Sequence, residues 1–134
     1  MTDSRTTINE LLEQARRGLD RVDPAAASEA VRAGATLIDI RADSQIEADG
    51  VIPGALVIPR NVLEWRLDPA SDHRHALAPQ LDDRVILMCN EGYQSSLAAA
   101  TLQQLGFARA TDLDGGFQAW RAAGLPVEGP DRRE

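Results

Sequence analysis

The 134-residue chain has few of the residues from which disulfides, metal sites and aromatic cores are built. Its single cysteine, Cys89, excludes an internal disulfide, and its two histidines leave no visible set of zinc ligands. With only 2 Trp, 2 Phe and 1 Tyr, the core is expected to consist mostly of Leu, Ile, Val and Ala. No apolar run approaches the length of a membrane span, and the first residues lack the apolar segment of a signal peptide. We therefore expect a cytoplasmic protein with no metal site.

Positive charge is also scarce, because 14 Lys and Arg stand against 21 Asp and Glu, for a formal net charge of −7. A negative net charge repels nucleic acid, so we expect no nucleic-acid partner. Because the sequence contains no membrane-spanning run, we also expect no membrane partner. Any site for an anion must be built from local groups. The hydrophobic share of 43% and the charged share of 26% are ordinary for one soluble globular domain.

Short apolar runs alternate with helical patterns along the chain. Thr7 and Glu10 have the spacing of a capping box, which predicts a helix ending near Gly18, and Pro24 suits the first turn of a second helix. We expect strands over 36–40, 55–58, 84–88 and 109–113, with 19–22 as a short edge strand, and further helices over 43–48, 61–67, 95–105 and 117–123. The alternation predicts an α/β fold with a small parallel sheet of about five strands and helices on both faces.

The expected organisation is a helical extension over 1–19, one folded domain over 20–128 and a mobile tail over 129–134. The helix of the extension packs either on the domain or on a second subunit, and the pattern does not choose between a monomer and a homodimer.

Cys89 stands where an apolar strand over 84–88 ends and the helix over 95–105 begins. The five residues after it contain one glycine and no aliphatic side chain, which is typical of a turn. Unpaired N–H groups and the partial positive charge of a helix N-terminus stabilise a thiolate and cradle an anion. Lone cysteines often fill core space, but this context favours a nucleophile. Ligands of parallel sheets bind beyond the carboxyl ends of strands, where Cys89 lies.

Four segments in order resemble motifs of the rhodanese family, and the resemblance covers about 22–127. They are Leu37-Ile38-Asp39-Ile40-Arg41, Glu47-x-x-Gly50-x-Ile52-Pro53-Gly54-Ala55, Cys89-x-x-Gly92-x-Gln94-Ser95 and Leu113-x-Gly115-Gly116-x-x-x-Trp120. The resemblance implies a single-domain sulfurtransferase without a cofactor. In that family a cysteine takes sulfane sulfur from a donor such as thiosulfate, holds it as a persulfide and passes it to a thiophilic acceptor.

By this resemblance Cys89 is the catalytic sulfur carrier, and its partners are a small sulfur donor or a thiol acceptor, with a protein persulfide as one candidate. Asp39 and Arg41 are expected to form a pair that fixes the loop ends, and Arg60 follows another strand near the site. The residues expected to bind the substrate, besides Arg60, are Asn90, Glu91, Gly92, Tyr93, Gln94 and Ser95.

Two loop residues depart from the family pattern. Gln94 stands where arginine is usual, and it hydrogen-bonds an oxyanion without pairing its charge. Glu91 adds a carboxylate that opposes a sulfonate-like donor. Losing one hydrogen bond to a charged group costs about 1.5–3 kcal/mol, and with the added repulsion anion affinity falls by roughly one to three decades. We therefore expect weak activity with thiosulfate and a less charged persulfide as the natural donor.

Two other functions stay open. Cysteine-dependent phosphatases and arsenate reductases use a similar anion cradle, although the phosphatase loop is longer and ends in arginine. A non-catalytic rhodanese-like module for binding or redox sensing is the other alternative. For the neighbouring side chains, we expect Trp65 in the core or a pocket wall, Tyr93 at the mouth of the site, and Ser95 and Ser96 as helix caps.

Overall fold

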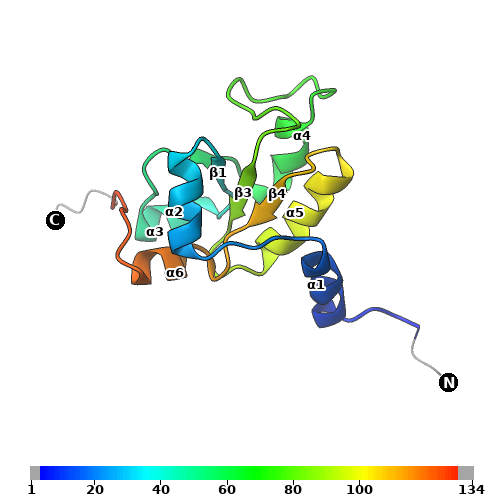
Figure 1. Ribbon diagram of the computed structural model, residues 1–134, viewed down its shortest axis with the longest axis horizontal. Helices are drawn as coiled ribbons and strands as arrows, with labels where there is room; N and C mark the ends of the chain where they lie inside the picture. The colour runs from blue at the N-terminus through cyan, green and yellow to red at the C-terminus, as the bar shows by residue number, and fades with distance from the viewer. Residues whose placement is uncertain (1–3, 130–134) are drawn as a thin grey trace.

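The computed structural model describes residues 4–129, which fold around a parallel sheet (Figure 1). Its four strands are β1 (Thr36–Asp39), β2 (Leu56–Val57), β3 (Val85–Met88) and β4 (Ala110–Asp112), in the order β2-β1-β3-β4. The α/β class is confirmed, but the expected count of about five strands is wrong. The stretch 19–22 contributes only Val22, in an isolated bridge to Leu113, because Asp23 caps the next helix immediately afterwards.

Seven helical segments surround the sheet. They are α1 (Ile8–Arg17), α2 (Pro24–Arg32), α3 (Asp43–Asp49), the 3₁₀ helix η1 (Arg60–Val62), α4 (Leu63–Leu67), α5 (Gln94–Gln104) and α6 (Gly116–Ala122). Helices α2 and α6 pack on one face of the sheet, and α4 and α5 pack on the other. In Figure 1, α1 stands at the margin of the molecule, beside α5.

The central strands are apolar on both sides because each face is covered by helices. In β3, Leu87 packs with α4 and α5, whereas Ile86 and Met88 pack with α2 and α6. All four side chains of β3 are buried. Successive side chains of β3 are packed on opposite faces of the sheet. This packing on both faces fixes the position of Cys89, the residue after the strand.

The local helix signals are confirmed at the N-terminal end of the chain. Thr7 Oγ1 accepts the Glu10 N–H at 3.1 Å, the Thr7 N–H donates to Glu10 Oε1 at 2.8 Å, and the helix ends at Gly18. Asp23 Oδ1 caps α2 by accepting the Ala26 N–H at 2.8 Å. These short-range patterns therefore determine where the first two helices begin.

The expectation for Trp65 is wrong, because its side chain is 59% exposed. Leu63 and Leu67 lie one helical turn apart and form the buried face of α4. Trp65, midway between them in the sequence, therefore points outward. Within residues 4–129, no helix combines the length and the apolar character needed to cross a bilayer. The predicted tail over 129–134 lies outside the described residues except for Gly129, and the boundary at 19–20 stays a prediction.

Candidate active site

Cys89 lies at the carboxyl end of β3, and backbone amides surround its sulfur. The N–H of Gly92 donates to Sγ at 3.1 Å, and the N–H of Ser95 points to Sγ at 3.4 Å. The residue is 4% exposed. Two amide donors aimed at one sulfur can stabilise negative charge that develops there during a reaction, and they also suit a second sulfur atom bonded to it.

The carbonyl groups of the same loop are held away from the sulfur. The first turn of α6 binds two of them: the Phe117 N–H donates to Cys89 O at 2.9 Å, and the Gln118 N–H donates to Asn90 O at 3.1 Å. Because each peptide group has its N–H opposite its C=O, anchoring these two carbonyls on α6 turns the N–H groups of Asn90 and Glu91 away from α6 and fixes the start of the turn that leads to Gly92. The loop geometry is therefore imposed by its surroundings as well as by its own turn.

Glycines allow this close approach between the loop and α6. Gly115 and Gly116 have φ of +81° and +62°, in the left-handed region that glycine adopts without steric cost. A Cβ on Gly116 would lie 2.5 Å from Cys89 O, and a Cβ on Gly92 would lie 2.7 Å from the Gly115 nitrogen. Larger residues at these two positions would push the loop and the helix apart.

A buried carboxylate, Asp112, binds the other side of the loop. Its Oδ2 accepts the hydroxyls of Ser95 at 2.7 Å and Ser96 at 2.8 Å, while Arg21 donates Nε to Oδ1 at 2.8 Å. The expectation that the two serines cap a helix is wrong. Helix α5 begins at Gln94 with Tyr93 at the capping position, so both serines lie inside the helix, and their hydroxyls donate to Asp112.

Arg21 also contacts the loop directly, since its Nη2 donates to Gly92 O at 2.9 Å. Burial lowers the pKa of Arg21, but hydrogen bonding and the charge of Asp112, followed by the charges of Asp114 and Cys89, outweigh it and raise the pKa overall. The guanidinium is therefore held in its charged form within electrostatic reach of the sulfur.

Helix α1 adds a second guanidinium. Arg16 donates Nη2 to Gly92 O at 2.8 Å and Nε to Ser96 Oγ at 3.0 Å, and it lies 5.7 Å from the centroid of the Tyr93 ring. Sequence reasoning missed Arg16, Arg21 and Asp112. No motif links them to Cys89, because the contacts join residues that are 71 to 91 positions apart.

An open cavity of about 250 Å³ lies at the mouth of the site. Its walls contain the predicted loop residues Asn90, Glu91, Tyr93 and Gln94 together with Cys89, and α3 adds Gln45. Gly92 and Ser95 are buried and face the sulfur with their amides. The structure thus brings the predicted loop residues together around one sulfur atom, and Tyr93 stands at the mouth with 60% of its surface exposed.

The remaining predicted residues lie in two ion pairs. Arg41 and Asp39 form the expected pair, fully buried, with Nη2–Oδ2 at 2.7 Å, and Arg41 also donates to Gly50 O at 2.7 Å. Arg60 pairs with Glu64 at 2.9 Å and is not among the residues that line the Cys89 cavity. A role for Arg60 in substrate binding, and for the Asp39–Arg41 pair in supporting the loop, stays a prediction.

In this site a cysteine follows a parallel strand, and backbone N–H groups of the next turn point to its sulfur. This arrangement is typical of α/β proteins that have a cysteine at the centre of an anion-binding loop. Within the described residues, no group of three or more His, Cys, Asp or Glu is placed to hold a metal ion.

Residues 23–123 match the model of the rhodanese-like domain, and the chain belongs to that family. A sulfurtransferase of Allochromatium vinosum is 35% identical over 95 residues, covering 71% of this chain and 79% of that protein. The thiosulfate sulfurtransferase GlpE of Ectopseudomonas mendocina is 38% identical over 102 residues, covering 76% and 84%.

Solved structures show the same fold. A Rhodopseudomonas palustris protein of unknown function, RPA3614, described as a possible tyrosine phosphatase, superposes with a TM-score of 0.84 at 34% identity, covering 96% of this chain and 98% of that one. The human single-domain sulfurtransferase TSTD1 superposes with a TM-score of 0.65 at 30% identity, covering 76% and 95%.

Proposed function

We propose that the protein is a cytoplasmic sulfurtransferase that carries sulfane sulfur as a persulfide on Cys89. The observation that supports this most strongly is the pair of amides from Gly92 and Ser95 aimed at Sγ. The relatives named as sulfurtransferases support the same reaction. A lone cysteine without a disulfide partner suits a reducing compartment, where its thiol stays available.

The reaction divides into two displacements at sulfur. In the first, the Cys89 thiolate attacks the outer sulfur of a persulfide R–S–SH; the Cys89 S–S bond forms, the bond inside the donor breaks, and RS⁻ leaves with the electron pair. With thiosulfate the leaving group is sulfite. In the second, an acceptor thiolate or cyanide attacks the outer sulfur and regenerates the Cys89 thiolate. The loop amides stabilise negative charge on sulfur throughout.

The charges at the mouth favour a donor with little charge. Glu91 and Gln94 are both exposed and line the cavity with Cys89, so an approaching sulfonate meets a carboxylate and no loop cation. A persulfide on a small thiol or on a protein avoids most of this repulsion. We propose such a persulfide as the natural donor, with thiosulfate as a weak one.

A phosphatase is the second candidate, because the description of RPA3614 suggests it for that protein. The positions from Cys89 to Gln94 offer no guanidinium to a phosphate, and this favours sulfur over phosphate.

The test compares thiocyanate formation from a small-thiol persulfide and from thiosulfate, with cyanide as the acceptor, and aryl phosphate hydrolysis. We expect thiocyanate from the persulfide at a higher rate than from thiosulfate, and no rate above the uncatalysed background with Cys89→Ser. Hydrolysis of the aryl phosphate that disappears in Cys89→Ser, without any thiocyanate, would establish the phosphatase instead.

A further inference from the structure

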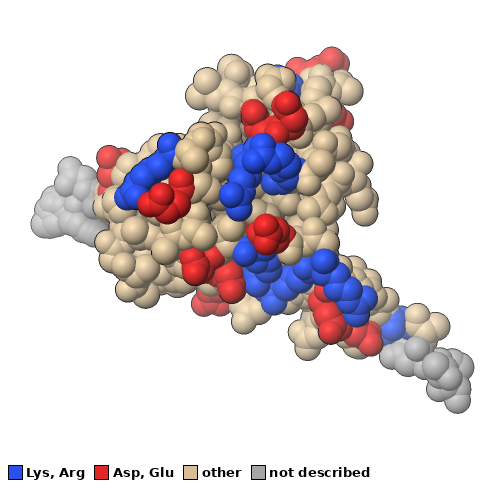
Figure 2. Space-filling model, in the orientation of Figure 1, with Lys and Arg blue, Asp and Glu red and all other residues tan. Residues whose placement is uncertain are grey.

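The sulfur loop carries a carboxylate and no positive charge of its own. Positions 89–96 contain Glu91 and neither Lys nor Arg. Any cation beside this loop therefore comes from another part of the chain. Figure 2 shows basic side chains gathered over α1 and the place where it meets the rest of the molecule.

Two guanidinium groups from that region converge on a single atom of the loop. The Gly92 carbonyl oxygen accepts Nη2 of Arg16 at 2.8 Å and Nη2 of Arg21 at 2.9 Å. The N–H of the same residue, Gly92, donates to Cys89 Sγ. One glycine thus contacts the sulfur on one side and two cations on the other. The Gly92 N–H and C=O belong to the peptide groups on either side of its Cα, so the two cations are bound one peptide group beyond the amide that contacts the sulfur.

The two cations differ in how their charge is balanced. Arg21 is paired with the buried Asp112 and with Asp114, at 2.8 and 3.2 Å. The contacts of Arg16 within the described residues are all with neutral groups: a carbonyl, the Ser96 hydroxyl and the Tyr93 ring. Arg16 is therefore the source of uncompensated positive charge beside the loop, whereas Arg21 fixes the loop to the sheet.

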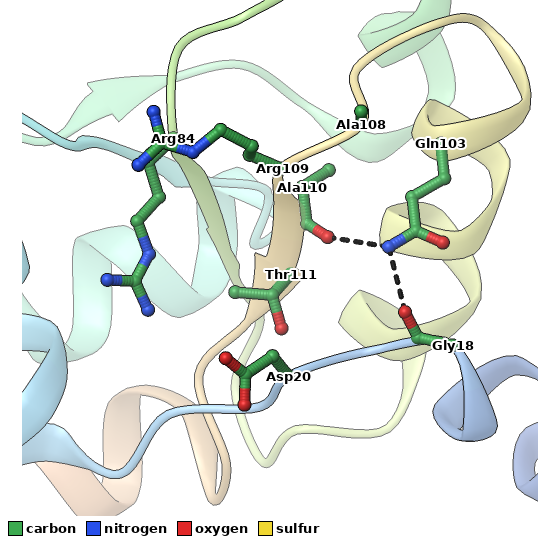
Figure 3. A pocket seen from close by; sticks show the side chains of 8 residues that line it. All are labelled: Gly18, Asp20, Arg84, Gln103, Ala108, Arg109, Ala110 and Thr111. Carbon is green, nitrogen blue, oxygen red and sulfur yellow. Dashed lines mark hydrogen bonds between the residues drawn. The ribbon is translucent and has the colours of Figure 1, made fainter.

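The C-terminal end of α1 is fastened, which keeps Arg16 in place. Gln103 of α5 donates Nε2 both to Gly18 O and to Ala110 O, each at 3.0 Å, as the dashed lines in Figure 3 show. These contacts tie the residue that ends α1 to α5 and to β4, next to a cavity of about 370 Å³ that shares no residue with the Cys89 cavity.

We propose that Arg16 is a positioning residue of the sulfur site, which holds the Gly92 carbonyl outward and supplies the positive charge that the loop lacks. The inference rests on the proposed function, since it assigns the charge that stabilises the Cys89 thiolate and persulfide. Arg16 lies in α1, outside the region matched by the family model, residues 23–123, so the proposal extends the sulfur site beyond the part of the chain that the family shares.

The experiment measures alkylation of Cys89 by iodoacetamide as a function of pH, which requires no sulfur transfer. Arg16→Gln is compared with Arg16→Lys and with Arg17→Gln. Arg17 is the matched control, because it lies on the same helix, has the same charge and pairs only with exposed Glu13 at 3.8 Å. Thermal unfolding of each variant checks that the fold is kept.

At an effective dielectric of about 20–40, removing one unit charge from the neighbourhood of a thiolate changes the thiolate population by roughly five- to thirtyfold. We therefore expect Arg16→Gln to slow alkylation at least about fivefold on the acidic side of the profile, with little difference at alkaline pH. Arg16→Lys is expected to stay within about twofold of the wild type, as is Arg17→Gln.

The inference is overturned if Arg16→Gln matches the wild type, if Arg17→Gln shifts the profile equally, or if Arg16→Lys shifts it as far as Arg16→Gln. These outcomes are separate from the proposed function, which the wild-type assays for thiocyanate decide. A wild type that forms thiocyanate while Arg16→Gln alkylates normally leaves the sulfurtransferase in place and removes the role of Arg16.

Discussion

Replacing Gly116 by alanine perturbs the contact that holds the sulfur loop against α6. The new Cβ would lie 2.5 Å from Cys89 O and 2.7 Å from the carbonyl carbon of Asn90, and both are backbone atoms that a rotamer change does not move. Gly124 gives a matched control at the other end of α6. Its φ is +77°, close to the +62° of Gly116, but a Cβ there meets nothing within 4 Å.

The two substitutions separate backbone strain from the clash. Placing an L-residue in the left-handed region costs about 1–2 kcal/mol, which applies to both glycines. Overpacking against backbone adds about 1–3 kcal/mol, which applies only to Gly116→Ala. We therefore expect the free energy of unfolding to fall by about 2–5 kcal/mol in Gly116→Ala and by about 1–2 kcal/mol in Gly124→Ala.

Urea denaturation followed by circular dichroism measures both values, and sulfur uptake by Cys89 measures the effect on the site. Gly116→Ala should also lose sulfur uptake, because the displaced loop turns its amides away from Sγ, whereas Gly124→Ala should keep it. Equal destabilisation by the two substitutions, with sulfur uptake retained in both, would refute the reasoning that α6 shapes the loop.

Three other substitutions test the charges around the loop. Gln94→Arg should raise turnover with thiosulfate about tenfold or more relative to the wild type, because one charged hydrogen bond is worth about 1.5–3 kcal/mol; no change in turnover would reject the electrostatic account of the loop. Asp112→Asn should lower the free energy of unfolding by about 3–5 kcal/mol, because it leaves Arg21 without its buried partner. Asp114→Asn, at an exposed carboxylate, should lower it by less than about 1 kcal/mol in the same urea titration. Because the pKa of Arg21 is raised, its stabilising contribution is complete below its ordinary pKa and is lost only in strongly alkaline solution, so the cost of Asp112→Asn should be the same at neutral and mildly alkaline pH.

The parts of the site that were predictable from sequence depend on neighbours in the chain. The Cys89 loop and the Asp39–Arg41 pair each occupy a few consecutive positions, so their local conformation is restricted by residue type. Short apolar strands between helices also sufficed for the α/β class.

The parts that sequence reasoning missed depend on tertiary contacts. Ser95 and Ser96 have the usual chemistry of helix caps, but Asp112, which lies sixteen to seventeen positions further along the chain, binds both hydroxyls. Arg16 and Arg21 look like ordinary surface charges in the sequence. The packing of α1 on α5 brings Arg16 to Gly92 O. The pairing of Val22 with Leu113, beside β4, brings Arg21 to the same oxygen.

Mass spectrometry of the intact protein after incubation with a small-thiol persulfide measures whether Cys89 accepts a sulfur atom. We expect the protein to gain the mass of one sulfur atom, the added mass to map to the peptide containing Cys89, and cyanide to remove it. A protein that gains no sulfur, or a Cys89→Ser variant that gains as much as the wild type, would show that Cys89 is not a sulfur carrier.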